Sequence, residues 1–390
     1  MSEVVWPGDA RAGALLSDDA LLAAMTAVEN GWLRCLAKAG LAPATDSQLG
    51  PVSAQQLGPV DVGGNPVIPL VEVLRSSAPE EIKPWIHRGL TSQDVLDTAL
   101  ALCLRDTADH ILLDVRRQVV RWRELAATHR SAVQPGRTLT QHAVPTTFGL
   151  TAANAMVAII DAAEDLAVAR RRLPVQVGGA AGTLAAVVAI GASAALSDQL
   201  AAELELAPSM PWHTNRRPLT RVADAMVACV DAWSKVANDV LVRTRPEVGE
   251  LSERSGGPSS TMPHKQNPVL SILIKRAGLL APHFAAALHT AAAASVDERP
   301  EGGWHAEWLP LRLIGRTAAV AASQAADLLE GLVVHEVRMA ANAAAAADAL
   351  LSEQQAVTGS TTSVNDYLGE ASRVIDDALR RADEFLGVPS

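Results

Sequence analysis

The sequence predicts an all-α fold built around a bundle of long helices. Aromatic residues make up only 3% of the 390 residues and Ala is abundant, which favours closely packed helices over a strand-rich sandwich. From Ser92 to about His129 the helical pattern continues without Pro or Gly, which gives roughly 37 residues and about 55 Å at 1.5 Å per residue. No strands alternate with the helical stretches. Because so long a helix needs partners along its whole length, we expect a bundle.

The net charge excludes several classes of partner. The formal charge is −10, whereas nucleic acids and anionic membranes both require a basic face. The same charge repels an anionic substrate at long range, so a site for an anion must be built from local cations and backbone amides. We therefore expect no nucleic-acid partner and no membrane partner.

The cysteines and the N-terminal residues indicate the compartment. Cys35, Cys103 and Cys229 lie far apart, with neither metal-site nor disulfide spacing, which is typical of a reducing cytosol and predicts no bound metal. No uncharged apolar run of about 18 residues occurs. The N-terminal residues lack the basic and apolar regions of a signal peptide. We expect a soluble, cytoplasmic protein.

The N-terminal part, residues 1–90, predicts a small domain of short helices. Residues 17–39 open with capping residues, carry apolar side chains at helical spacing and stop at Gly40. Residues 41–84 are broken by Pro and Gly, with one short helix around residues 70–75.

The central part, residues 91–342, predicts the bundle itself. After the first long helix, residues 136–149 are expected to form a loop that enters a helix over roughly residues 145–171, with Pro145 in its first turn. Apolar residues within residues 222–240 recur close to every 3.5 positions, as in the seam of a bundle.

The remaining helical stretches complete the prediction. A Gly-rich turn at residues 178–183 leads to a helix that reaches about residue 205, and its spacing is too loose for a dinucleotide site. Further helices are expected over about residues 268–294 and from residue 304 through the 330s. Residues 343–390 predict a short C-terminal helical domain.

The stretch GGPSSTMPHKQNP, residues 256–268, must be a loop because its glycines and prolines cannot continue either neighbouring helix. Its backbone amides and the side chains of Ser259, Ser260, Lys265 and Asn267 offer hydrogen-bond donors to an anion. A mobile lid over a carboxylate-bearing substrate fits this inventory. A solvated connection between two helices fits the composition equally well.

A second candidate anion site is HRGLTSQDVLDT, residues 87–98. Thr91 and Ser92 stand at the start of the long helix, where hydroxyls cap free amides and the helix dipole favours a bound carboxylate. An ordinary N-cap without a ligand is the commoner explanation of such a pair taken alone.

Both stretches resemble motifs of the fumarase, aspartase and adenylosuccinate lyase superfamily. SSTMPHKQNP is similar to its GSSxMPxKxNP signature, and the second stretch is similar to its H-x-G-x-TS-x-D-x-x-DT motif. Within the superfamily the chain most resembles the bacterial 3-carboxy-cis,cis-muconate cycloisomerase family, through GGNPVIPL, RTLTQHAVPTTFG, GGAAGTLAA, PWHTN and WHAEW. This resemblance implies a three-domain fumarase/aspartase-like fold and a homotetramer whose active sites are shared between subunits.

The resemblance also implies the chemistry. Superfamily enzymes exchange a proton α to a carboxylate through an enediolate-like intermediate, which needs a positioned base and a ring of donors. Ser259 matches the catalytic serine, with Lys265 as its cation and Asn267 as its amide. A serine hydroxyl is a poor base in water, so the loop must close and exclude solvent. The residues expected to hold substrate carboxylates by position are His87, Thr91, Ser92, Thr138 and Gln141, with Arg137 as a further cation or a structural brace.

Three further residues allow two interpretations each. His142 either lines the site and takes part in catalysis or only hydrogen-bonds its loop. Arg216 and His305 either face the substrate or are buried for structural reasons.

Leu139 is the informative departure from the superfamily pattern, because amine-releasing relatives have His at this place. A leaving amine needs a proton, whereas a carboxylate with a pKa of about 4 does not. In the cycloisomerase family a carboxylate oxygen of the substrate itself adds to the double bond, so an apolar residue is tolerable there. This favours lactone formation over amine release, and it leaves open a lyase that expels another stable anion.

Other departures keep alternatives open. Pro258 stands where the signature has Gly, and residues 343–365 are short for a third domain. The leading hypothesis is conversion of 3-carboxy-cis,cis-muconate to carboxymuconolactone in protocatechuate breakdown, without metal or organic cofactor. The alternatives are a β-eliminating lyase that releases fumarate or a related product, and a non-catalytic helical scaffold.

Overall fold

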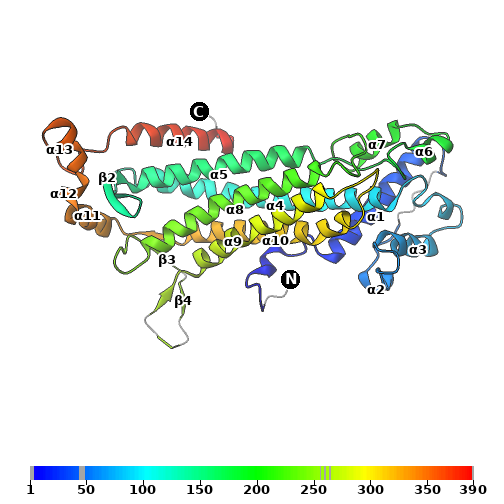
Figure 1. The fold of residues 1–390 in the computed structure, drawn as a ribbon, viewed down its shortest axis with the longest axis horizontal. Coiled ribbons are helices and arrows are strands. Elements are labelled where there is room, and N and C mark those ends of the chain that lie inside the picture. The colour runs from blue at the N-terminus through cyan, green and yellow to red at the C-terminus, as the bar shows by residue number, and fades with distance from the viewer. Residues whose placement is uncertain (1–3, 44–48, 255, 259–260, 263–264, 389–390) are drawn as a thin grey trace. The chain divides into compact units, whose positions relative to one another are not determined.

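The computed structural model describes residues 4–43, 49–254, 256–258, 261–262 and 265–388. Helices dominate these residues, and the strands form three two-stranded pairs (Figure 1). The all-α class predicted from the sequence is confirmed.

The long helices expected in the middle of the chain are present. They are α4 (Ser92–Thr128), α5 (Phe148–Arg171), α8 (Arg217–Arg243), α9 (Val269–Ala293) and α10 (Gly303–Glu330). α4 has 37 residues and begins at the serine that the sequence marked as its start.

The chain divides into two compact units, each made of three separate segments. Unit 1 comprises Met1–His110, Asp165–Val227 and Ala281–Ala319, and unit 2 comprises Ile111–Glu164, Ala228–Leu280 and Val320–Ser390. The division falls within each of the five long helices. The division into three domains that the sequence suggested stays a prediction.

Unit 1 holds the short N-terminal helices. Besides parts of the long helices it contains η1 (Asp9–Ala12), α1 (Asp18–Lys38), α2 (Ala54–Leu57), α3 (Val67–Ser77), η2 (Lys83–Trp85), α6 (Ala185–Ala189) and α7 (Ala195–Glu203). The helix expected over residues 17–39 is α1, and the Ser17 hydroxyl accepts a hydrogen bond from the Ala20 amide at 3.1 Å as an N-cap. The single helix expected up to about residue 205 is instead interrupted, because Gly191 adopts a φ of 90° between α6 and α7.

Unit 2 holds the strand pairs and the C-terminal helices. The strands are β1 (Val133–Thr138), β2 (Gln141–Thr147), β3 (Leu251–Glu253), β4 (Gly257–Pro258), β5 (Gln266–Asn267) and β6 (Leu332–Val334). The last helices are α11 (Glu336–Ala345), α12 (Ala347–Leu350), α13 (Ser352–Thr358) and α14 (Ala371–Leu386). The helix expected to run from residue 304 through the 330s ends at Glu330, where β6 follows and pairs with β3.

Buried polar contacts tie the helices of unit 2 together. Trp233 on α8 donates its indole hydrogen to Gln118 of α4 at 2.7 Å, and the amide of Gln118 donates to the Ala322 carbonyl of α10 at 2.8 Å. All three residues are buried. Burying a polar group costs little free energy only when the group is hydrogen-bonded. These contacts therefore fix how the three helices are aligned with one another.

Residues 133–147 form a β-hairpin, which corrects the sequence prediction of a loop followed by a helix from about residue 145. Pro145 lies in β2 opposite Pro135, and α5 begins only at Phe148. The register shifts between Pro135 and Arg137, which accommodates a proline in each strand. The hairpin rests on a small apolar cluster formed by Val133, Ala343 and Leu350.

In the part of the chain that the structure describes, α9 alone is long and apolar enough to cross a membrane by length and composition. Only 28% of its most apolar window is buried within the chain. The helix also carries Lys275 and Arg276 in its N-terminal third. Its apolar surface is therefore available for contact with another protein surface.

Candidate active site

The loop of residues 256–268 is closed at its base by a short strand pair. Gly257 lies opposite Asn267, whose side-chain amide donates to the Gly257 carbonyl oxygen at 3.3 Å. A Cβ added to Gly257 would stand 2.3 Å from a methyl group of Val269, so glycine is needed for this close approach. The described base of this loop, which we call the flap, is therefore a short antiparallel strand pair in unit 2.

The strand before the flap is hydrogen-bonded to the start of α9, the helix that follows the flap. Glu253 on β3 accepts hydrogen bonds from the backbone amides of Leu270 and Ser271 at 3.1 and 2.9 Å, and from Ser271 Oγ at 2.6 Å. These amides are free donors of the first helical turn, where a carboxylate is also favoured by the helix dipole. Lys265 of the flap is exposed, and the proposed catalytic Ser259 lies outside the described residues.

Arg137 is held by a buried carboxylate. Its Nη1 and Nη2 donate to the two carboxylate oxygens of Glu250 at 3.0 and 2.7 Å, and Glu250 is fully buried. Asn342 donates to the same carboxylate at 2.9 Å. Of the two interpretations of Arg137, this bidentate pair favours the structural brace.

Three candidate residues lie at the exposed end of the β1–β2 hairpin. Thr138 pairs with Gln141 across the two-residue turn, and the side chains of Thr138, Gln141 and His142 are all exposed. Arg137 and His142 line a cavity of about 510 Å³ in unit 2. This volume suits a small molecule.

In unit 1, Thr91 lies directly before α4 and Ser92 is its first residue. The Thr91 amide donates to Asp94 Oδ2 at 3.0 Å, so a carboxylate from the first turn binds this free amide. The Thr91 hydroxyl accepts a hydrogen bond from Arg299 Nη2 at 2.7 Å. The Ser92 hydroxyl is hydrogen-bonded to none of the described residues, which leaves it open to a ligand.

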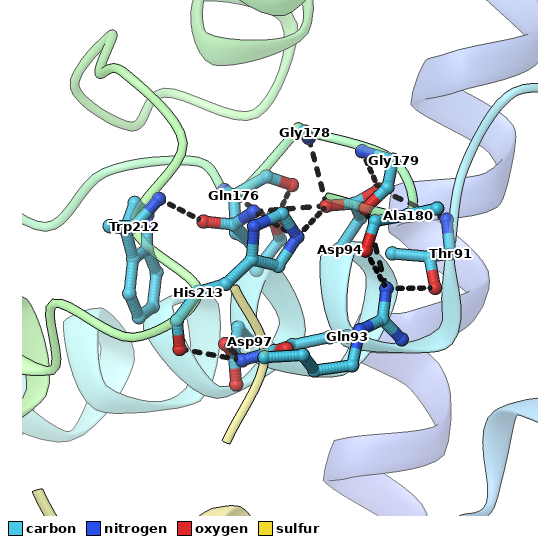
Figure 2. A network of polar contacts seen from close by, with 12 residues as sticks. Thr91, Gln93, Asp94, Asp97, Gln176, Gly178, Gly179, Ala180, Trp212 and His213 are labelled. Carbon is cyan, nitrogen blue, oxygen red and sulfur yellow. Dashed lines mark hydrogen bonds and ion pairs between the residues drawn. The ribbon is translucent and has the colours of Figure 1, made fainter. Parts of the chain in front are cut away.

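Asp94 is the centre of a buried polar network (Figure 2). Its carboxylate accepts hydrogen bonds from the backbone amides of Gly178 and Gly179 at 2.9 and 3.0 Å, and from Gln176 Nε2 at 3.0 Å. His213 Nε2 lies 3.2 Å from the same carboxylate. The start of α4, the Gly-rich turn and the PWHTN loop are thereby fixed to one another by a single fully buried acid.

His87 is held in an unusual backbone conformation by another buried acid. Its φ is 61°, a region that costs a residue with a side chain about 1–3 kcal/mol. Glu29, which is fully buried, accepts the His87 amide hydrogen at 2.9 Å, and its second oxygen lies 2.7 Å from His87 Nδ1. Nε2 is hydrogen-bonded to none of the described residues, so the second ring nitrogen is available for a substrate.

Arg216 lies between two buried carboxylates of unit 1. Its guanidinium donates to Asp97 at 2.7 and 3.0 Å and to Glu307 at 2.8 to 3.1 Å. Burial disfavours its charged form, but Asp97 and Glu307 outweigh this and raise the pKa of Arg216. For Glu307, burial outweighs the attraction of Arg216, and together with repulsion from Asp97 it raises the pKa of that carboxyl. These contacts favour the structural interpretation of Arg216.

His305 connects two of the sequence motifs. Its Nε2 lies 2.8 Å from the carbonyl oxygen of Gly64 in the GGNPVIPL stretch. Its ring packs edge-on against Trp304 and at a tilt against Trp308, with centroid distances of 5.3 and 4.8 Å. Although His305 is exposed, its Nε2 contacts the backbone of Gly64, so the side chain helps to hold this loop.

The candidate residues fall into two groups. The group in unit 1 contains His87, Thr91, Ser92, Arg216 and His305. The group in unit 2 contains Arg137, Thr138, Gln141, His142, Lys265 and Asn267. The side chains held by contacts to residues distant in sequence are His87, Arg137, Arg216 and His305.

The sequence did not assign the acids that organise these groups. Asp94 and His213 lie inside motifs that the sequence singled out, so their positions within TSQDVLDT and PWHTN were the available signal. Glu29 and Glu250 lie in stretches without any such motif, and their partners are 58 and 113 residues away.

Comparison with known proteins supplies the family. A family described as Lyase matches residues 62–278. The chain is 40% identical to a nitrosuccinate lyase of Streptomyces davaonensis over 88% of this chain and 77% of that protein. It is 37% identical to a 3-carboxy-cis,cis-muconate cycloisomerase of Bradyrhizobium diazoefficiens over 82% of this chain and 71% of that protein. This chain belongs to the lyase family.

Structural similarity extends this assignment to the whole lyase fold. The crystal structure of a 3-carboxy-cis,cis-muconate lactonizing enzyme from Pseudomonas putida has a TM-score of 0.87 and 28% sequence identity. The match covers 98% of this chain and 99% of that one. The chain is thus an enzyme of the fumarase/aspartase superfamily, and its mostly helical, fumarase/aspartase-like fold agrees with the sequence prediction.

Proposed function

We propose that this lyase-family chain is a cycloisomerase that converts 3-carboxy-cis,cis-muconate to carboxymuconolactone in the protocatechuate branch of the β-ketoadipate pathway. The observation that carries the proposal is the similarity to a lactonizing enzyme over 98% of this chain. The 37% identity to a second cycloisomerase supports it independently.

The proposed reaction needs no external leaving group. A carboxylate oxygen of the substrate forms a bond to the β carbon of its own double bond, and a proton is delivered to the α carbon, so that the product is an isomer. Ser259 would transfer this proton, and Lys265 and Asn267 would stabilise the enediolate-like charge that develops. Thr91, Ser92, Thr138 and Gln141 would hold the substrate carboxylates.

Leu139 is consistent with this chemistry. It is 95% exposed at the tip of the β1–β2 hairpin, between Thr138 and Gln141. An apolar side chain supplies no proton to a leaving group, and a carboxylate oxygen requires none.

We also infer the kind of substrate, the compartment and the oligomeric state of the enzyme. The partner is a small polycarboxylate, and neither metal nor organic cofactor takes part. The compartment is the cytoplasm. The chain forms a homotetramer in which the two groups of candidate residues complete each other's sites across subunits.

A second candidate is supported by the 40% identity to a nitrosuccinate lyase. In that case the chain would remove the α proton of a substituted succinate while a stable anion leaves the β carbon, with fumarate or a related alkene as product. Leu139 is compatible with this reaction too, because a stable anion also leaves without a proton.

Assays on the purified chain separate the two candidates. Loss of ultraviolet absorbance from 3-carboxy-cis,cis-muconate supports the cycloisomerase, whereas fumarate release from nitrosuccinate without turnover of the muconate selects the eliminating lyase. We predict that Ser259→Ala lowers kcat on the true substrate by at least about 100-fold, because proton transfer by a positioned group contributes roughly that much. The variant should keep the mass of the unaltered oligomer in light scattering. Full activity of Ser259→Ala would remove Ser259 from the mechanism.

A further inference from the structure

Arg299 lies beside Thr91 in unit 1 and precedes α10. Its Nη2 donates to Thr91 Oγ1 at 2.7 Å and to the carbonyl oxygens of Ala180 and Gly179 at 3.2 and 3.3 Å. Figure 2 shows the three acceptor residues grouped beside Asp94. All three acceptors are neutral, so the guanidinium charge is not compensated by these contacts.

Two more deeply buried arginines of unit 1 have carboxylate partners. Arg216 contacts Asp97 and Glu307, and Arg316 contacts Asp9 at 2.9 Å. Arg299 is half-buried, yet no ion pair joins it to any residue within the described ranges. A cation that is partly removed from water without an anion is unfavourable, so this position is suited to an anionic ligand.

Arg299 has unused donors that can bind a carboxylate oxygen. Only Nη2 takes part in the contacts with Thr91, Gly179 and Ala180, which leaves Nη1 and Nε without a hydrogen bond to the described residues. The N–H groups of Nη1 and Nε diverge, so each can donate one charge-assisted hydrogen bond to a carboxylate oxygen. In a chain of net charge −10, such a local cation is also what an anionic substrate requires.

We propose that Arg299 is a substrate-binding residue, which forms an ion pair with the substrate carboxylate that Thr91 contacts. The inference rests on the proposed function only in that the substrate is a polycarboxylate. It adds a binding residue to the Thr91 end of the site and assigns the Gly-rich turn the role of orienting that residue through its carbonyl oxygens.

A purely structural latch is the competing explanation of the same contacts. A latch that joins the Arg299 segment to Thr91 and the Gly-rich turn needs only hydrogen-bond donors, which a neutral amide would provide without an uncompensated charge. Arg299→Gln keeps a donor and removes the charge, whereas Arg299→Ala removes both. The two variants therefore separate charge recognition from latching.

The test measures binding by calorimetry, with citrate as a tricarboxylate that the enzyme is not expected to turn over, and kinetics with the true substrate. Both Arg299→Ala and Arg299→Gln should weaken citrate binding about tenfold to a hundredfold, as expected for a lost charge-assisted pair. KM should rise by a similar factor while kcat changes less. Arg221→Ala, which removes another half-buried arginine of unit 1 that pairs with no carboxylate among the described residues, should stay within about twofold of the unaltered chain.

Each other outcome has a defined meaning. If Arg299→Gln binds citrate as tightly as the unaltered chain, Arg299 is a latch and the inference is overturned. An unaltered chain that binds neither citrate nor its substrate would overturn it as well. Weakened citrate binding in both variants, together with no cycloisomerase activity in the unaltered chain, would support the carboxylate site and reject the proposed function.

Discussion

At the residue scale, the candidate side chains are positioned by acids that are themselves inaccessible to substrate. Glu29 fixes His87, Asp94 fixes the Thr91 amide and Glu250 fixes Arg137, and all three acids are fully buried. Burying a carboxylate is costly unless donors surround it, so each acid imposes one geometry on the groups that donate to it. Candidate side chains that are held rigidly in this way can bind substrate groups without reorganising during the reaction.

The candidate residues could be identified from the sequence, but their supporting contacts could not. The pair of hydroxyls at the start of α4 was visible because capping is a local property of the chain. Whether Arg137 faces substrate or braces the fold depended on Glu250, which only the folded chain brings within 2.7 Å of its guanidinium. The sequence left both roles open for that reason.

The Arg216 cluster yields a prediction about pH. One guanidinium faces two carboxylates, and Asp97 additionally accepts hydrogen bonds from Gln93 at 3.0 Å and from Trp304 at 2.9 Å. Glu307 is therefore the acid that takes up a proton, in agreement with the rise in the pKa of Glu307 from its ordinary 4.5 through burial.

Because folded Glu307 holds its proton more tightly than the unfolded chain does, its contribution to the free energy of unfolding grows as pH falls from its raised pKa towards 4.5. We predict that the difference in unfolding free energy between the unaltered chain and Glu307→Gln increases from about pH 7 to about pH 5. Urea denaturation at several pH values measures it, with the exposed Glu384→Gln as control. A difference that shrinks on acidification would contradict the assignment.

At the element scale, the β1–β2 hairpin shows where sequence rules succeed and fail. The bounds of α4 and the cap of α1 follow from local patterns, and the structure reproduces both. The hairpin was missed because each strand contains a proline and the turn is Leu139–Thr140, both with positive φ values of 47° and 70°. Such turns normally carry Asn and Gly, which tolerate this conformation. Local preference and tertiary structure disagree here, as they often do at functional sites.

This strained turn predicts a stabilising substitution. Leu139→Asn combined with Thr140→Gly should raise the free energy of unfolding by about 1 kcal/mol, because both residues then suit positive φ. Thermal and urea unfolding measure the change. Leu139→Val is the matched control and should lower the free energy of unfolding, because a β-branched side chain is disfavoured at positive φ. If the double substitution destabilises the chain, the turn is not strained in the way its φ values indicate.

At the scale of the whole molecule, two features favour association between chains: the exposed surface of α9 and the division of the candidate residues between two units. α9 exposes large apolar side chains, including Ile272 at 47% and Leu279 at 63%. A water-exposed apolar face of this length is unfavourable in an isolated chain, and contact with other copies would cover it. The proposed homotetramer thus provides both the cover for α9 and the means to bring complementary loops together.

We predict that Leu279→Lys dissociates the oligomer. Covering a leucine contributes about 1.5–3 kcal/mol per copy, and covering an unpaired lysine instead is strongly unfavourable. Light scattering coupled to size exclusion should show a mass of four chains for the unaltered protein and a smaller species for Leu279→Lys, with activity lost in parallel if the sites are shared between chains as proposed. Val357→Lys, at a position 78% exposed on α13, is the matched control and should change neither mass nor activity. A Leu279→Lys protein that keeps both the four-chain mass and full activity would show that α9 is not the covered surface.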